Sequence, residues 1–311
     1  MDYEKIVLVT RKTRLEGLIE RFNTRAQAQF YIEHSGGDFT VYVAEHELYH
    51  EGLATLRASL AQMLKLQVIE RGMLPNFMFA PTDIVVTIGI DGLVVNTAKY
   101  LTEQPIVAVN PDPAHIDGIL LPFTVSNATM AVTNLLKGAA TIRTVTMAEA
   151  ALNDGQRLLA FNDLFIGVRS HTSARYVIRI QDQQERHSSS GIIVSTGAGA
   201  TGWLSSLFNM ANGISTFFGQ QQQRLPYIQL PIDADQLVFV VREPFVSKTS
   251  GASLVCGRIT AASPLVIEAQ TPESGVIFSD GVEADFIDFN AGATATIGIA
   301  SERAHLVARQ A

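Results

Sequence analysis

The sequence predicts an α/β domain with a parallel-type sheet, followed by a β-rich domain. In the first third of the chain, short β-branched runs alternate with helix-like segments. From about residue 138, short strand-like runs follow one another between turn residues, and helical periodicity is scarce apart from residues 201–212. The length of 311 residues also exceeds the usual size of one hydrophobic core, which favours two domains.

The first domain contains four runs typical of buried parallel strands, and between them two helical patterns. Leu53, Leu56, Leu60 and Leu64 recur at three- and four-residue spacing, which predicts a helix with one apolar face. A second helix is expected over residues 93–101. The strands are expected over residues 5–10, 39–45, 83–89 and 104–110.

The second domain is expected to consist mainly of short strands joined by turns. We place the domains at residues 1–126 and 127–294, with residues from about 295 to 311 free to return to the first domain. The glutamine-rich stretch 219–226 is expected to be a solvated connection. The strands are expected over residues 140–147, 158–168, 174–182, 236–243, 263–270, 275–281 and 293–300.

Composition and charge exclude several classes of function. A hydrophobic fraction of 47% with 17% charged residues is typical of a well-packed globular protein. The formal net charge of −7 disfavours a broad nucleic-acid or anionic-membrane surface. The single cysteine, Cys256, excludes an intrachain disulfide and a thiolate-rich metal site. No stretch resembles a signal peptide or a membrane span, so we expect a cytoplasmic protein with neither nucleic acid nor membrane as partner.

One loop matches the G-x-G-x-x-G fingerprint of dinucleotide-binding folds, at Gly197, Gly199 and Gly202. That fingerprint should open the first βαβ unit and be followed after about 20 residues by a carboxylate. Here it lies inside the β-rich half, and the first carboxylate after it is Asp233. The dehydrogenase interpretation therefore fails. A loop of small residues can still admit a nucleotide, or it can be a tight strand-to-helix connection. Trp203 is a core aromatic residue if the loop is only a connection, and a surface that packs against a purine if the loop binds a nucleotide.

A second loop places a carboxylate where α/β sheets bind ligands. The strand expected over residues 83–89 runs directly into Asp91 and a helix. Ligands of such sheets bind beyond the carboxyl ends of the strands. Asp91 is either a turn-forming aspartate or a carboxylate that accepts a proton from a hydroxyl nucleophile beside a phosphate-binding turn.

Three motifs together resemble the NAD kinase family. "GIDG" (89–92), "FNDLFIG" (161–167) and "STGAGATGW" (195–203) resemble, in the same order, that family's Gly-Gly-Asp-Gly loop, its Asn-Glu pair and its Thr-Pro-Thr-Gly-Ser-Thr-Ala-Tyr loop. "PIVAVNPDPAHIDGILLPF" (105–123) and "VREPF" (241–245) are closest to the divergent mitochondrial-type branch. The resemblance covers nearly the whole chain and implies an NAD kinase-like fold.

The resemblance also implies roles for individual residues. Asp91 matches the aspartate near the reacting hydroxyl, and Gly89 and Gly92 match glycines that lie along phosphates. The remaining matches lie in the β-rich domain. They are Asn162 and Asp163 at the ribose and adenine side of NAD, and Thr196, Gly199, Thr201 and Trp203 at the nucleotide.

The implied function is that of an NAD kinase, a transferase of NADP biosynthesis that phosphorylates the adenosine 2′-hydroxyl of NAD with ATP. Mg²⁺ is expected to arrive with ATP rather than at a dedicated metal site, and the family implies a homodimer or homotetramer with a site between the domains. Ile90 replaces the second glycine of the family loop. Two alternatives stay open: a catalytically weak or inactive dinucleotide-binding relative, and a lipid or sugar kinase of the same superfamily.

Overall fold

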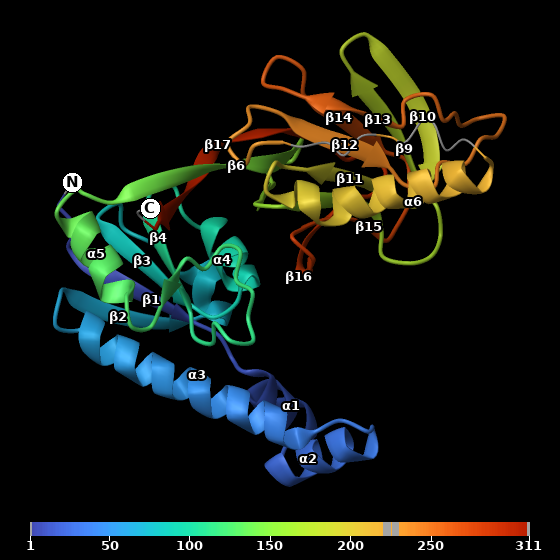
Figure 1. Cartoon of the computed structure of the whole chain (residues 1–311). Coiled ribbons are helices and arrows are strands. Elements are labelled where there is room, and N and C mark those ends of the chain that lie inside the picture. The colour runs from blue at the N-terminus through green and yellow to red at the C-terminus, as the bar shows by residue number, and fades with distance from the viewer. Residues whose placement is uncertain (1, 220–224, 226–229, 310–311) are drawn as a thin grey trace. The chain divides into compact units, whose positions relative to one another are not determined.

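The computed structural model describes residues 2–219, 225 and 230–309. The chain divides into two compact units, Met1–Arg143 with Ala304–Ala311 (the α/β unit) and Thr144–Arg303 (the β-rich unit) (Figure 1). The glutamine-rich connection predicted over residues 219–226 lies mostly outside the described residues. None of the helices that the structure describes has the length and apolarity needed to cross a membrane.

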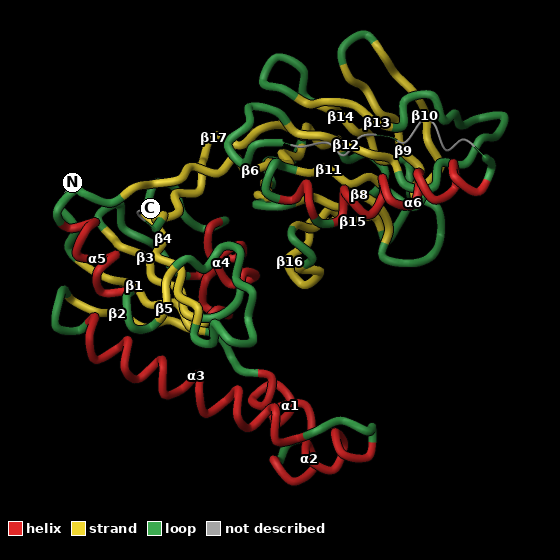
Figure 2. Tube along the Cα trace, viewed as in Figure 1, coloured by secondary structure: helices red, strands yellow, loops and turns green. Residues whose placement is uncertain are grey.

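A parallel sheet forms the centre of the α/β unit, as the sequence predicts. Its hydrogen-bonded order is β2-β1-β3-β4, and every one of these pairs is parallel (Figure 2). The two-residue strand β5 and the end of β17 also pair with β4 in parallel, with His305 of β17 beside Pro105. The strands are β1 (Lys5–Thr10), β2 (Lys65–Glu70), β3 (Asp83–Ile88), β4 (Pro105–Asn110), β5 (Phe123–Thr124) and β17 (Thr294–Ala308).

Helices supply the rest of this unit's hydrophobic core. Leu56 and Leu60 of α3 and Val132 of α5 pack with alternate residues of β1, β3 and β4, such as Ile84 and Val107. Alternation along a strand directs these side chains to one face of the sheet. The helices are α1 (Arg14–Phe22), α2 (Arg25–His34), α3 (Phe39–Leu60), α4 (Asp91–Ala98) and α5 (Ala128–Leu136), with a 3₁₀ helix η1 at Arg71–Asn76.

The strand predicted over residues 39–45 is wrong, because these residues begin the long helix α3. Asp38 caps that helix: its Oδ1 accepts a hydrogen bond from the Thr40 amide at 2.8 Å. Phe39 and Tyr49 are buried on the helix together with Leu56. The β-branched and aromatic residues favour a strand locally, but burial of one helical face outweighs this weak preference.

The β-rich unit is built from antiparallel strands in two sheets that share a core, which confirms the predicted fold class. Six strands follow the order β13-β12-β11-β8-β15-β16, and β10-β9-β14-β17, with β6 and β7, form the second layer. Inner residues such as Ile166, Phe239 and Ile267 fill the space between the layers. The strands are β6 (Thr141–Leu152), β7 (Arg157–Ala160), β8 (Asp163–Val168), β9 (Ala174–Ile180), β10 (Gln183–Ser189), β11 (Ile192–Ser195), β12 (Leu237–Val241), β13 (Cys256–Ile259), β14 (Leu265–Ala269), β15 (Gly275–Ser279) and β16 (Val282–Asp288).

A short 3₁₀ helix, η2 (Gly199–Thr201), and the helix α6 (Trp203–Phe217) follow β11 and pack on the other face of the six-stranded sheet (Figure 1). Leu204 of α6 contacts Val238 of β12, and Trp203 packs near Ile193 of β11. Because β11 pairs antiparallel with both β8 and β12, the glycine loop after it does not belong to a parallel βαβ unit. The topology thus excludes the dinucleotide-binding fingerprint on structural grounds.

Candidate functional site

The α/β unit has a topological switch point between its neighbouring strands β1 and β3. The chain leaves β1 toward β2 on one side and leaves β3 toward β4 on the other. In open α/β sheets, ligands bind where the loops diverge at the carboxyl ends of two such strands. A cavity of about 530 Å³ lies here, with Arg11 from the loop after β1, Ile90 from the loop after β3 and Asp112 from the loop after β4. Its volume is within the range of small-molecule sites.

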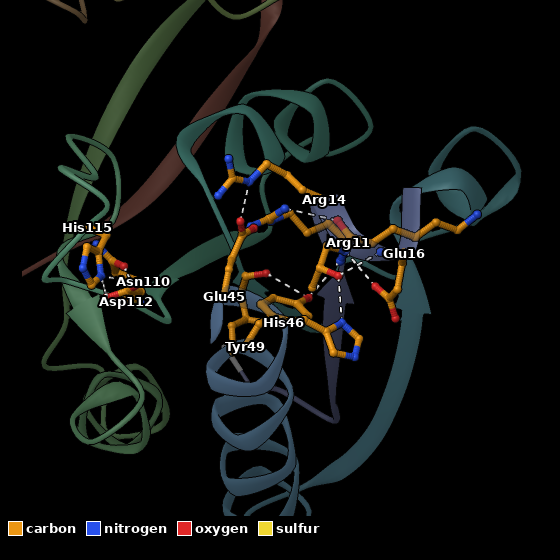
Figure 3. Close-up of polar contacts among 12 residues, drawn as sticks. Arg11, Arg14, Glu16, Glu45, His46, Tyr49, Asn110, Asp112 and His115 are labelled. Atoms are coloured by element: carbon orange, nitrogen blue, oxygen red, sulfur yellow. Dashed lines mark hydrogen bonds and ion pairs between the residues drawn. The ribbon is translucent and has the colours of Figure 1, made fainter. Parts of the chain in front are cut away.

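Two arginines and one glutamate line this cavity (Figure 3). Arg11 Nη2 donates to Glu45 Oε1 at 3.2 Å, and Arg14 Nε donates to the other oxygen of the same carboxylate. The Arg11 side chain is only 13% exposed, and its buried Nε has no hydrogen-bond partner among the described residues. Two guanidinium groups against one carboxylate leave a net positive charge on this wall, which suits a phosphate or carboxylate ligand, while the Asp112 carboxylate lines the cavity elsewhere.

The opposite wall carries Asp112 and His115. Nδ1 of His115 lies 2.8 Å from Asp112 Oδ2, and His115 itself is 80% exposed. Asn110, at the end of β4, holds this segment: its Oδ1 accepts from the Asp112 amide at 2.9 Å and its Nδ2 donates to the Ile116 carbonyl at 2.9 Å (Figure 3). The cavity therefore has a hydrogen-bonded wall as well as a cationic one.

Asp91 is the first residue of α4 and holds a neighbouring loop through its carboxylate. Oδ1 accepts a hydrogen bond from the Leu120 amide at 2.9 Å, and Oδ2 accepts one from the Ile119 amide at 3.2 Å. A carboxylate offers about four acceptor positions, so each oxygen retains capacity for one more donor. The two amides fix the orientation of the carboxylate, as a proton acceptor at a reacting hydroxyl requires.

The glycines that flank Asp91 differ in what surrounds them. A Cβ on Gly89 would lie 3.1 Å from Cδ of Arg11 and 3.2 Å from a methyl group of Leu93, so a side chain there would displace the arginine. At Gly92 the nearest atom to such a Cβ is 4.0 Å away, so the space tolerates a side chain. Ile90 has ordinary extended torsions, φ −111° and ψ 167°, and is 41% exposed. It therefore imposes no backbone strain and instead adds an apolar surface to the cavity.

In the β-rich unit, hydrogen bonds bring Asn162 and Asp163 together with Thr196. The Thr196 amide donates to the Asn162 carbonyl at 2.9 Å, and its hydroxyl donates to the Phe161 carbonyl at 2.6 Å. Asp280 completes the arrangement, since its carboxylate accepts from the amides of Phe161, Asn162 and Asp163 at 3.1, 2.6 and 3.2 Å. Asp280 thereby holds the segment 161–163 in place.

Asp163 is an unusual carboxyl group. It is only 9% exposed at the start of β8, beside Ser195 of β11. Burial, and secondarily the charge of Asp280, raises the pKa of Asp163 from 3.8 to about 7. Near neutral pH the group therefore changes between a hydrogen-bond donor and a purely accepting carboxylate. Perturbed carboxyl groups of this kind gather at functional sites.

Two glycines of the 195–203 loop lie so close to neighbouring backbone carbonyls that a side chain would not fit. A Cβ on Gly197 would lie 2.0 Å from the Pro231 carbonyl oxygen, and one on Gly199 would lie 2.2 Å from the Asn162 carbonyl oxygen. No L-residue with a side chain fits at such distances. Gly199 therefore packs directly against the backbone of Asn162, and its amide donates a hydrogen bond to the Thr196 hydroxyl at 3.2 Å.

Trp203 lines a second cavity, of about 340 Å³, in the β-rich unit. Its ring is stacked on Phe165 at a centroid distance of 5.8 Å and an interplanar angle of 5°. Arg242 lies over the indole at 5.4 Å, and Phe278 forms another part of the wall. Aromatic faces with nearby guanidinium groups suit a planar ring that carries phosphate. Thr201 is exposed at the end of η2, two residues before Trp203 in the sequence.

The predicted residues thus form two groups, one in each unit. Gly89, Asp91 and Gly92 adjoin the cavity at the switch point, and the other predicted residues gather around β8, the loop after β11 and the start of α6. Sequence reasoning missed the charged residues of the first cavity, because they come from three segments that are far apart in the sequence. These are Arg11, Arg14, Glu45, Asp112 and His115.

Comparison with curated proteins finds NAD kinases. The chain is 27% identical over 124 residues to the NAD kinase of Chlorobaculum tepidum, 28% identical over 129 residues to that of Clostridium kluyveri, and 30% identical over 126 residues to that of Chlorobium luteolum. Each match covers 39% of this chain and 43–44% of the relative's own length. No family model matches the chain.

Comparison with solved structures finds the fold of NAD kinases over nearly the whole chain. An NAD kinase from Archaeoglobus fulgidus in complex with ATP has a TM-score of 0.56 at 15% identity, covering 97% of this chain and 93% of that one. Yeast NADH kinase complexed with NADH has a TM-score of 0.58 at 14% identity, covering 100% of this chain and 85% of that one. Curated relatives by sequence and solved structures by fold thus confirm the resemblance of this chain to the NAD kinase family.

Proposed function

We propose that this chain is an NAD kinase that transfers the γ-phosphoryl group of ATP to the adenosine 2′-hydroxyl of NAD, giving NADP and ADP. The observation that carries the proposal is the position of Asp91. In a chain with the fold of NAD kinases, it begins a helix directly after β3, next to a cavity with a cationic wall at the switch point of the sheet. The matching names of the curated relatives support it.

In this proposal Asp91 accepts the proton of the 2′-hydroxyl while the oxygen attacks the γ-phosphorus and the bond to the β-phosphate oxygen breaks. The amides of Ile119 and Leu120 hold the carboxylate for this step. Arg11 and Arg14 offer guanidinium groups to phosphate oxygens of the substrates, and ATP enters as its magnesium complex. Gly89 and Gly92 let the loop backbone approach phosphates.

The proposal gives the β-rich unit the task of holding the adenosine of NAD. Asn162 and Asp163 contact the ribose and adenine side, and Trp203 supplies a stacking surface at the aromatic cavity. Thr196, Gly199 and Thr201 form the loop along the nucleotide. The support is the hydrogen-bonded assembly of this loop with the segment 161–163 and the rise in the pKa of Asp163 to about 7.

The experiment that tests the proposal is an acceptor panel with purified protein and magnesium ATP. NAD, NADH, a sphingoid base and simple sugars are compared by direct detection of the phosphorylated product, with Asp91→Asn run in parallel. NADP or NADPH formation that depends on Asp91 is expected. Product from a lipid or sugar alone would replace the proposal with another kinase. NAD binding without any product would identify a dinucleotide-binding relative.

Three further expectations come from the sequence. A homodimer or homotetramer is checked by light scattering coupled to size-exclusion chromatography. A cytoplasmic location is checked by cell fractionation. Assignment to the mitochondrial-type branch stays a prediction from the segments 105–123 and 241–245.

A further inference from the structure

Two histidines and a glutamate meet at the junction of α1 and α3, next to the arginine wall of the switch-point cavity but not among its lining residues. His46 and His50 lie four residues apart on α3, and Glu16 belongs to the first turn of α1. Figure 3 labels Glu16 and His46 among the polar side chains of this region. One ligand atom of each residue lies within 4.8 Å of the corresponding atoms of the other two. The proposed phosphoryl transfer assigns none of the three a role.

The spacing of the histidines is that of a helical metal site. Residues 46–50 read His-Glu-Leu-Tyr-His, and two histidines at i and i+4 present both imidazoles on one face of a helix. The imidazole rings of His46 and His50 have centroids 4.4 Å apart. Zinc accepts two histidines and one glutamate, with the fourth position left for water or another ligand.

One distance within the cluster already matches a tetrahedral ion. His50 Nε2 lies 3.1 Å from Glu16 Oε1. Two ligand atoms bound at about 2.0–2.1 Å to a tetrahedral zinc ion lie roughly 3.3 Å apart, so the two groups need almost no rearrangement. Both side chains remain accessible for metal entry, at 43% exposure for His50 and 34% for Glu16.

A second layer of contacts orients the ligands. The Thr13 hydroxyl lies 2.9 Å from His46 Nδ1, which leaves Nε2 of that ring for an ion. The Thr13 amide donates to Glu16 Oε2 at 2.7 Å, which fixes the carboxylate and leaves Oε1 toward His50. Metal-binding side chains are characteristically held in this way by hydrogen bonds to their other polar atoms.

We propose that Glu16, His46 and His50 bind one divalent transition-metal ion of the zinc type, which ties α1 to α3. Two residues of the cavity wall lie next to the cluster in the sequence: Arg14 is two residues before Glu16 on α1, and Glu45 directly precedes His46 on α3. Metal binding therefore stabilises the helical pair that carries the cationic wall. The inference is independent of the phosphoryl-transfer reaction.

Zinc binding by untagged, chelator-stripped full-length protein tests this proposal. We expect one equivalent of zinc per chain, measured by competition with a chromogenic chelator, and an increase in melting temperature on zinc addition. His50→Gln should weaken zinc affinity at least about tenfold. Glu16→Gln should do the same while keeping the helix cap, since glutamine also serves in a capping box.

The matched control is His34→Gln. This histidine lies on α2, where it stacks on Phe30 and contacts that residue's carbonyl, away from the cluster. It should leave zinc affinity unchanged. Wild-type protein that binds no zinc, or equal affinity of the wild type, His50→Gln and Glu16→Gln proteins, would overturn the proposal. Melting temperatures without zinc show that the variants are folded.

Discussion

Asp91 illustrates how one side chain can be both structural and reactive. Its two oxygens accept amide hydrogen bonds from Ile119 and Leu120, which fix the loop that follows β4. The same rigid carboxylate is the group that we propose takes the proton of the acceptor hydroxyl. A substitution at this position therefore needs readouts that separate the two roles.

Asp91→Asn should lower kcat by about 10²–10⁴, because an amide cannot accept the proton. The dissociation constant of NAD should change little. The free energy of unfolding should fall by about 1 kcal/mol. The NH2 group of asparagine takes the place of one carboxylate oxygen and cannot accept a hydrogen bond from the loop amide there. Kinetics, NAD titration and chemical denaturation on one preparation check this. Turnover within about twofold of wild type would leave Asp91 with the structural role alone.

Asp163 should make stability depend on pH. Its pKa is about 7 in the folded protein and near 3.8 when unfolded, so the folded state holds an extra proton between these values. Stability linked to Asp163 is therefore present at low pH and is lost as pH rises through this window, by an amount on the order of 4 kcal/mol. Asp163→Asn should remove this loss. Urea denaturation at pH 5, 6, 7 and 8 should show the variant gaining stability relative to wild type as pH rises; parallel curves would contradict it.

At the scale of elements, the connection from β11 into α6 is set by contacts of its glycines. Gly199→Ala should destabilise the protein by about 2 kcal/mol or more, because its Cβ would lie 2.2 Å from the Asn162 carbonyl oxygen. Gly213→Ala, within α6, is the matched control. No atom lies within 4 Å of a Cβ there, so alanine should stabilise the helix by about 0.5–1 kcal/mol. Thermal denaturation distinguishes the opposite signs.

Trp203 begins α6 and is the only tryptophan of the chain, so its fluorescence reports on the aromatic cavity. NAD should change its emission, and Trp203→Ala should weaken NAD binding by about 1–3 kcal/mol if an adenine stacks there. Trp203→Phe, which can keep the stacking on Phe165, should weaken it less. Phe217→Ala, at the 82% exposed far end of α6, should have no effect. Unchanged affinity in Trp203→Ala would remove this residue from the site.

The elements that could be predicted from sequence are those whose burial pattern is local. The runs that form β1, β3 and β4 are buried throughout or nearly so, and their short length and β-branched content favour strands. Residues 39–45 were misread because their helical burial depends on packing with α1 and α2. The predicted loop residues gather in the structure, but the cationic cavity could not be foreseen, since only folding brings Arg11 and Glu45 together.

At the scale of the whole molecule, the negative net charge of the chain opposes the binding of negatively charged substrates. The chain carries a formal charge of −7, yet its proposed substrates are anions. Arg11 and Arg14 give one wall of the cavity a local positive charge, although the carboxylates of Glu45 and Asp112 also line the cavity. Anion binding therefore depends on a few side chains rather than on the general field of the protein.

Substrate binding should accordingly stabilise the folded chain as a whole. At a concentration 100 times its dissociation constant, NAD or magnesium ATP should add about 2.7 kcal/mol to the free energy of unfolding. A sphingoid base at the same concentration should add nothing. Differential scanning fluorimetry over a ligand series measures the shifts. Stabilisation by the lipid and not by either nucleotide would contradict the proposed function.

The strand β17 has a consequence for how the chain is made. It leaves the β-rich unit after Arg303, and its final residues pair with β4 in the α/β unit. Roughly 190 residues separate Asn110 from Ala304, which corresponds to ~10–40 s of synthesis on the ribosome. During that interval the edge of β4 beside His305 lacks its final partner. The nascent α/β unit must therefore wait, with a strand edge open to wrong pairing, until the β-rich unit has been translated.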